Sequence, residues 1–189
     1  MKKYLWLIMI VLLIFSLMGC SENIEEKREQ EEMKIYGFSE LYKAPKARDD
    51  QTLDNVIKIV FIDSYELEHK SSIAINVGEK GLFFHPVINS GIEYSELDYK
   101  LTESDISELV KILDKYQVME WSELYGDRKV YGDGWPNFWY LKLQFSDGTV
   151  KSAKGYYDGG DEFPENLRPF VKELEEFVAS KEEEASIEE

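Results

Sequence analysis

Few residues in this chain can carry covalent chemistry. The sequence has one cysteine, Cys20, and two histidines, His69 and His85. A thiolate is a nucleophile and a metal ligand, but a single cysteine cannot form a disulfide within the chain. The histidines lack the spacing of metal ligands, and no G-x-S-x-G elbow, H-E-x-x-H pair or phosphate-binding glycine loop occurs. We therefore predict that both histidines are ordinary surface or strand-end residues, and we assign no catalytic residue, metal ligand or cofactor.

The residues before Cys20 suggest a use for its thiol. Residues 1–3 include two lysines, and residues 4–17 are apolar except for Ser16. A run of this length is short for a membrane-spanning helix and typical of the apolar part of a signal peptide. The motif Leu17-Met18-Gly19-Cys20 then resembles the lipobox of bacterial lipoproteins.

This resemblance implies a lipid anchor. In lipoproteins a diacylglycerol is attached to the cysteine sulfur, and a signal peptidase cuts before the cysteine, here between Gly19 and Cys20. Two acyl chains, at roughly 0.8 kcal/mol per buried methylene, anchor a protein stably. The implied location is the extracytoplasmic face of the cell membrane, with the bilayer as a partner through the lipid. An uncleaved N-terminal membrane helix is the alternative interpretation.

Composition divides the chain into four parts. Residues 1–19 are the predicted signal peptide, and residues 20–52 are a lipidated N-terminus with a charged tether. Residues 53–180 form a single predicted domain, and residues 181–189 are an acidic, frayed tail. Apolar and aromatic residues at 35–42 could dock on the domain.

Hydrophobic patterning predicts the elements of that domain. β-branched runs indicate a meander, and Asp147-Gly148 indicates a hairpin turn. Thr102 is the expected N-cap of one amphipathic helix, and Asn166 is that of a second. The fold class is α+β, an antiparallel sheet packed against two helices. The predicted strands are residues 56–62, 72–77, 81–84, 94–101, 138–145 and 150–157, and the helical stripes run from 106 to 116 and from 167 to 178.

The second half of the domain resembles an uncharacterised domain of exported proteins from low-GC Gram-positive bacteria. The resemblance covers about residues 102–178 and implies a helix, a hairpin and a second helix packed together, without a known activity. It rests on Tyr116-x-Val118-x-x-Trp121, Trp139-x-Leu141-x-Leu143-x-Phe145-x-Asp147-Gly148-Thr149, Gly155-Tyr156 and Pro164-Glu165-Asn166-Leu167.

Charge narrows the classes of partner. The chain has 22 Lys and Arg against 38 Asp and Glu, a formal net charge of −16. Such a surface repels nucleic acid and anionic headgroups and favours a cationic peptide, a basic protein surface or a divalent cation. The alternative is that the charge only keeps the protein soluble. Calcium could bind among the acidic residues of the glycine-rich loops, although their spacing is unlike an EF-hand. These residues are Asp127, Asp133, Asp158, Asp161 and Glu162.

Aromatic residues mark the expected partner surface. Along 138–145 the side chains alternate, so that Phe138, Tyr140, Lys142 and Gln144 lie opposite the core-facing set. We predict a partner surface formed by Trp135, Phe138, Tyr140 and Tyr156. The alternative is that residues 35–42 and the loop at 122–136 cover this face.

Three functions fit these features. The first is a non-catalytic surface lipoprotein that binds a ligand or an envelope protein or wall component. The second is a carboxylate-based hydrolase acting on cell-wall polymer or peptide, because so many acidic residues can form pairs. The third is an accessory or immunity-like lipoprotein that stabilises a membrane complex.

Overall fold

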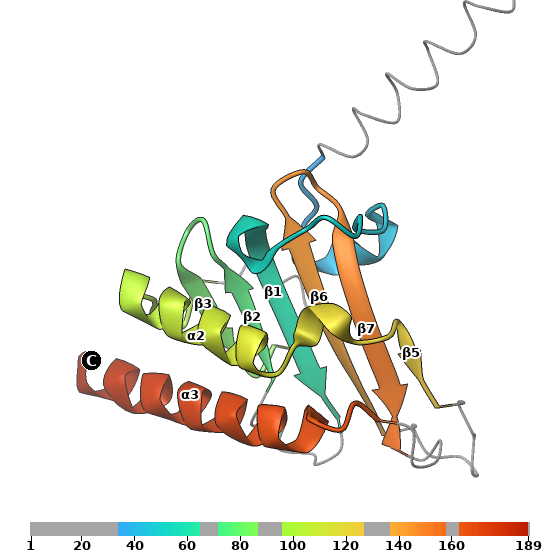
Figure 1. The fold of residues 1–189 in the computed structure, drawn as a ribbon. Helices are drawn as coiled ribbons and strands as arrows, with labels where there is room; N and C mark the ends of the chain where they lie inside the picture. The colour runs from blue at the N-terminus through green and yellow to red at the C-terminus, as the bar shows by residue number, and fades with distance from the viewer. Residues whose placement is uncertain (1–33, 65–71, 87–95, 127–136, 158–162, 189) are drawn as a thin grey trace, which may run out of the picture.

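The structure is a computed structural model of the chain and describes residues 34–64, 72–86, 96–126, 137–157 and 163–188. Its centre is a seven-stranded sheet in the order β4-β3-β2-β1-β6-β7-β5, in which only β5 and β7 pair in parallel. The predicted α+β class, with a mostly antiparallel sheet and two packed helices, is confirmed (Figure 1). The strands are β1 (Val56–Asp63), β2 (Ile73–Asn76), β3 (Gly81–Phe84), β4 (Tyr99–Lys100), β5 (Leu124–Tyr125), β6 (Phe138–Phe145) and β7 (Val150–Tyr156).

The meander and the hairpin share one sheet because β1 pairs with both β2 and β6. The hairpin turn forms as Asp-Gly predicts: Gly148 has a φ of 86°, and the Asp147 carboxylate accepts a hydrogen bond of 2.9 Å from the Thr149 N–H. Two strands differ from expectation. The fourth strand shortens to β4, and β5 forms inside the segment predicted as loop.

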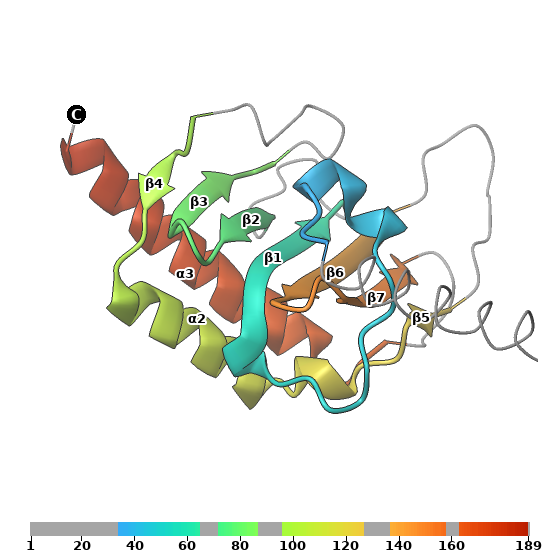
Figure 2. The ribbon, with the colours of Figure 1, turned by 90° about the horizontal axis from the view of Figure 1, so that it is seen from above.

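Helices α2 (Glu103–Lys115) and α3 (Leu167–Glu188) cover one face of the sheet (Figures 1 and 2). Every second side chain of β6 is buried between the sheet and these helices, and Trp139 and Phe145 are fully inaccessible to solvent. Phe170 of α3 packs edge-on against Phe61 and Trp121, with ring centroids 5.2 Å apart in each pair. Burial of these aromatic residues makes this face the main core.

A side-chain hydrogen bond caps the start of α2, whereas the side chain of Asn166, the expected N-cap of α3, bonds to other residues. Thr102 and Asp105 form a full capping box at α2, as the sequence predicts. The main-chain oxygen of Asn166 accepts the Phe170 N–H at 3.0 Å. The Asn166 side chain, however, accepts from Trp121 Nε1 at 3.1 Å and donates to the main-chain oxygen of Tyr116. Asn166 therefore ties α3 to the segment that follows α2.

Helix α3 runs past residue 180, where the sequence predicts a frayed tail, and ends at Glu188. Lys181 explains the extension, because its ammonium forms ion pairs with Asp105 at 2.7 Å and with Glu184 at 2.9 Å. Tyr99 of β4 also donates to Glu184. This hydrogen bond and burial raise the pKa of Tyr99 to about 12. The last turns of α3 are thus held by β4 and by the start of α2.

The opposite face of the sheet is partly covered by η1 (Phe38–Lys43), a short 3₁₀ helix (Figure 2). Tyr36, Phe38 and Leu41 are buried in a second core. Their neighbours there include Val60, Ile62, Ala74 and Val150. Residues 34–52, which the sequence groups with the tether, are therefore in part a packed piece of the domain. Two further short 3₁₀ helices are η2 (Leu53–Asn55) and η4 (Val118–Glu120).

Candidate functional site

The structure brings together part of the predicted partner surface. Phe138, Tyr140 and Tyr156 lie on β6 and β7, whereas Trp135 falls outside the described residues. Gly19 and Cys20 also fall outside them, so cleavage and lipid attachment stay predictions.

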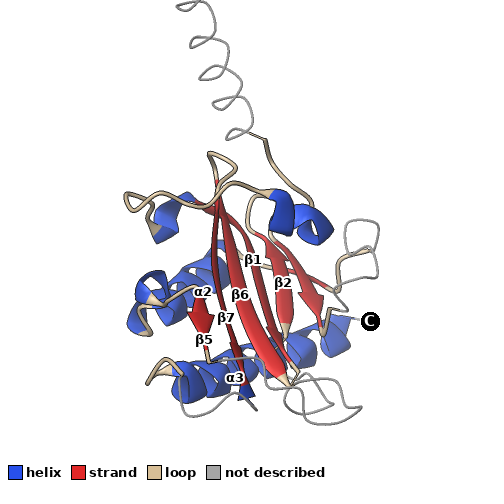
Figure 3. Ribbon diagram, turned by 90° about the vertical axis from the view of Figure 1, so that its right-hand side faces the viewer, coloured by secondary structure: helices blue, strands red, loops and turns tan. Residues whose placement is uncertain are grey.

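Strand register places three cross-strand pairs on the face opposite α2 and α3. Phe138 lies opposite Tyr156, Tyr140 opposite Lys154, and Lys142 opposite Ser152. Directly opposite residues point to the same side of a sheet, so these six side chains form one surface. We call them the β6–β7 strip; Figure 3 shows the two strands beside η1.

The aromatic side chains of the strip, Phe138, Tyr140 and Tyr156, are half-buried. The rings of Phe138 and Tyr140 are stacked, with centroids 6.2 Å apart and planes 3° from parallel. Both pack against the second core beneath η1. Burial raises the pKa of the Tyr140 phenol well above its ordinary value, so this group stays neutral. The segment at 35–42 thus covers part of the predicted surface, and Phe138, Tyr140 and Tyr156 stay partly exposed.

The strip also carries two lysines, Lys142 and Lys154, that form no ion pair among the described residues, although Lys154 is near enough to Glu123 to help lower the pKa of that carboxyl. Lys142 Nζ lies 5.6 Å from the centroid of the Tyr140 ring, and Lys154 is exposed on the next strand. Burial, and then repulsion from Lys154, lowers the pKa of Lys142. An incoming anion would relieve this repulsion, so the strip can bind an anionic group beside an aromatic surface.

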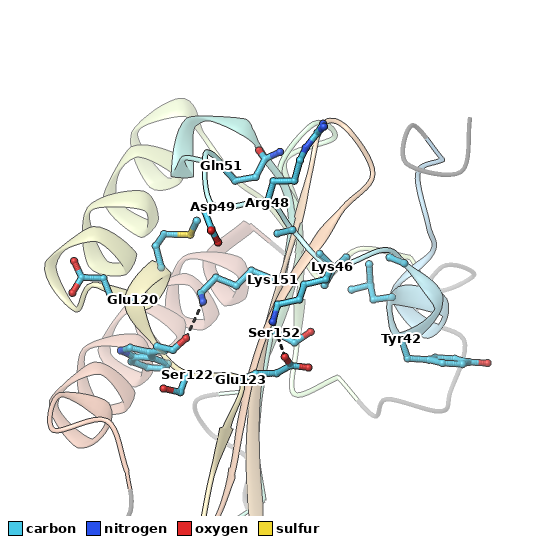
Figure 4. A pocket seen from close by; sticks show the side chains of 16 residues that line it. Tyr42, Lys46, Arg48, Asp49, Gln51, Glu120, Ser122, Glu123, Lys151 and Ser152 are labelled. Carbon is cyan, nitrogen blue, oxygen red and sulfur yellow. Dashed lines mark hydrogen bonds and ion pairs between the residues drawn. The ribbon is translucent and has the colours of Figure 1, made fainter. Parts of the chain in front are cut away.

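A groove of about 640 Å³ adjoins the strip along the outer edge of β7 (Figure 4). Its walls are η1 and residues 44–51 on one side and η4 with residues 121–123 on the other. Ser152 belongs to both the groove and the strip.

The charges lining the groove are mixed and largely paired. Lys46 and Glu123 form an ion pair across it at 3.0 Å. The Lys46 hydrogen bond lowers the pKa of Glu123. Lys151 donates to the Trp121 main-chain oxygen at 2.8 Å. Burial, followed by repulsion from Lys46, lowers the pKa of Lys151.

The other candidate residues do not join this site. His85 follows β3 and pairs with Glu182 of α3 at 2.7 Å, at the far side of the sheet. His69 and the five acidic residues proposed for calcium are outside the described part. Within the described ranges, no group of three or more potential metal ligands occurs.

Sequence reasoning predicted both strands and placed Phe138, Tyr140 and Tyr156 on the surface, but it did not include Ser152 and Lys154 of the second strand. Period-2 alternation places Phe138, Tyr140 and Lys142 on one face. The partners Ser152 and Lys154 depend on hairpin register, for which the Asp-Gly turn was the available signal.

In the part of the chain that the structure describes, no helix is long and apolar enough to cross a bilayer. No protein-family model, curated protein or solved structure matches this chain.

Proposed function

We propose that this protein is a non-catalytic binding module, lipid-anchored through Cys20 at the extracytoplasmic face of the cell membrane. Its β6–β7 strip captures an acidic segment of an envelope protein. The observation that carries this proposal is the pair Lys142 and Lys154, which form no ion pair among the described residues and stand beside stacked aromatic rings.

Charge on the strip differs from charge on the whole chain. The net charge of −16 predicts a cationic partner, but binding is decided by the groups at the contact. A charge-assisted hydrogen bond to a partly desolvated ammonium contributes about 1.5–3 kcal/mol, more than an exposed ion pair contributes. The long-range repulsion slows association with acidic partners, so the local lysines must provide the specificity.

Lipid on Cys20 supplies membrane affinity that the acidic protein surface cannot. Residues 20–33 then separate the lipid from the first described residue, Lys34. The proposed module works on partners near the membrane without inserting its own helices, which agrees with the apolar surface being turned inward against the sheet.

The groove is where the hydrolase alternative would find its carboxylates. Asp49, Glu120 and Glu123 line it. A glycosidase-like mechanism requires one carboxyl group that stays protonated near neutral pH. Lys46 acts in the opposite direction on Glu123, because it lowers the pKa of that carboxyl. This direction argues against Glu123 as the general acid of such a mechanism.

Crosslinking in living cells tests the proposal. A photo-reactive amino acid in place of Tyr156 would be activated in the lipidated protein, and captured proteins would be identified by mass spectrometry. The variant K142Q/K154Q should lose the captured partner. The control K111Q/K172Q removes the same charge from exposed positions of α2 and α3 and should retain it. Equal capture by both variants would refute the strip as the docking surface.

A further inference from the structure

The outer edge of β7 is covered at two points and open between them. Residues 45–47 cover the first point, where the Val150 N–H donates to Pro45 at 2.8 Å and Val150 accepts from Ala47 at 2.9 Å. Strand β5 and the residue before it cover the second, where the Lys154 N–H donates to the main-chain oxygen of Glu123 at 3.1 Å.

Ser152 lies midway between these points, and its main-chain N–H and C=O groups face the same outer edge of β7. Main-chain groups of successive strand residues point to opposite edges, so Val150, Ser152 and Lys154 share an edge. The inner edge belongs to residues such as Tyr157, whose N–H donates to Asn137 on the β6 side. Among the described residues, neither flank supplies a main-chain partner for Ser152.

The groove lies beside this position, and the exposed Lys46–Glu123 ion pair that spans it must open to admit a partner. Ser152 lines it, together with Lys46 and Glu123 (Figure 4). Lys154 follows Val150 by four residue steps, which is about 13 Å of strand at ~3.3 Å per step. Because the outward main-chain groups of Val150 and Lys154 are already covered, only one residue of an extended chain can pair with the edge, at Ser152.

We infer that an extended peptide adds to the β7 edge in this groove, with one residue exchanging both main-chain hydrogen bonds with Ser152. This inference rests on the proposed function and names how the acidic segment is held. Peptides that extend a sheet gain affinity from main-chain hydrogen bonds and specificity from alternate side chains.

Strand addition also specifies the chemistry of the paired residue. Its side chain lies on the same face as Ser152, which is the face of the β6–β7 strip. Lys142 stands opposite Ser152, and Lys154 is the next residue along that face. The paired residue is therefore Asp or Glu, and its neighbours in the peptide are residues that favour extended structure.

The test uses a defined probe, the acetylated and amidated pentapeptide Val-Thr-Glu-Thr-Val, with a fluorescent label. We expect it to bind the lipid-free protein from residue 21 onward, measured by fluorescence anisotropy. S152P removes the N–H that faces the groove, in a position where an edge strand tolerates proline, and should weaken binding roughly tenfold. The matched control S152A keeps the N–H and should bind within about twofold of the unchanged protein.

A modified peptide gives a second test that does not depend on how well a protein variant folds. Methylation of the central glutamate amide removes the donor to the Ser152 oxygen and should also weaken binding roughly tenfold. Equal binding of the methylated probe, or no binding of the pentapeptide at millimolar concentration, would overturn strand addition. If methylation and S152P have no effect while K142Q/K154Q loses the probe, strand addition fails and the proposed strip survives. If K142Q/K154Q binds the probe as the unchanged protein does, the strip fails.

Discussion

Lys181 near the end of α3 and Asp105 in the first turn of α2 form an ion pair of 2.7 Å, and each side chain is less than a tenth exposed. The same carboxylate completes the capping box with Thr102. One aspartate therefore joins the start of one helix to the end of the other, in the layer that supports the sheet opposite the β6–β7 strip.

Removing the lysine should destabilise the fold strongly. K181M leaves Asp105 charged and buried without its partner, which costs about 3–5 kcal/mol in the free energy of unfolding. K172M on the same helix is the matched control, because the Lys172 side chain is 76% exposed. It should stay within about 0.5 kcal/mol of the unchanged protein. Urea denaturation measures both, and equal stabilities would show that the pair contributes little.

The same pair predicts how stability depends on pH. Burial by itself would raise the pKa of Asp105, but hydrogen bonds from Lys181 and Thr102 outweigh it and hold the pKa below its ordinary 3.8. A lowered folded pKa gives stability that is present above the unfolded pKa and lost as pH falls through the folded value. The advantage of the unchanged protein over D105N should therefore be constant between about pH 5 and 8 and shrink below about pH 4. An advantage that persists unchanged at about pH 2 would contradict this pKa direction.

Gly155 on β7 should not accept a side chain. A Cβ there would lie 2.6 Å from Trp139 Nε1, and Trp139 is fully buried. We expect G155A to lower the free energy of unfolding by about 1–3 kcal/mol, because the ring has no free volume to move into. At Gly78 the nearest atom to an added Cβ is 3.7 Å away, so G78A is the control and should be tolerated. Thermal unfolding of the two variants compares them directly.

Docking of the N-terminal segment should contribute to stability. Leu41 is 2% exposed beneath η1, whereas its neighbour Tyr42 is 71% exposed. L41A should cost about 2–4 kcal/mol, and Y42A should cost less than about 0.5 kcal/mol. If chemical denaturation finds the two variants equally stable, residues 34–52 behave as a tether and not as part of the domain.

Lipid attachment at Cys20 should decide where the protein resides. C20A cannot form the thioether, so the unprocessed chain should accumulate and incorporation of labelled fatty acid should disappear. Fractionation of cells and electrophoretic mobility measure both effects. A C20A protein that is still cut and retained at the membrane with bound fatty acid would refute the lipid anchor.

Local signals determined the elements of this fold. Alternation along residues 138–145 defined which side chains of β6 enter the core, since a strand has a period of two. Thr102 and Asp105 defined the start of α2, and Asp147-Gly148 defined the hairpin, because caps and tight turns depend on neighbouring residues. The motif ending in Cys20 is also local, and it carries the predicted location.

Long-range pairing was decided only by the tertiary structure. Nothing near Lys181 in the sequence indicates that it is buried, because its partner Asp105 lies on another helix. The apolar residues around Leu41 could dock or stay free, and the exposed face of the sheet provided the site. Ser152 is open at the β7 edge because two segments from distant parts of the chain stop on either side of it. Hydrophobic pattern does not specify which surfaces meet, so the strip and groove emerge only when the sheet is assembled.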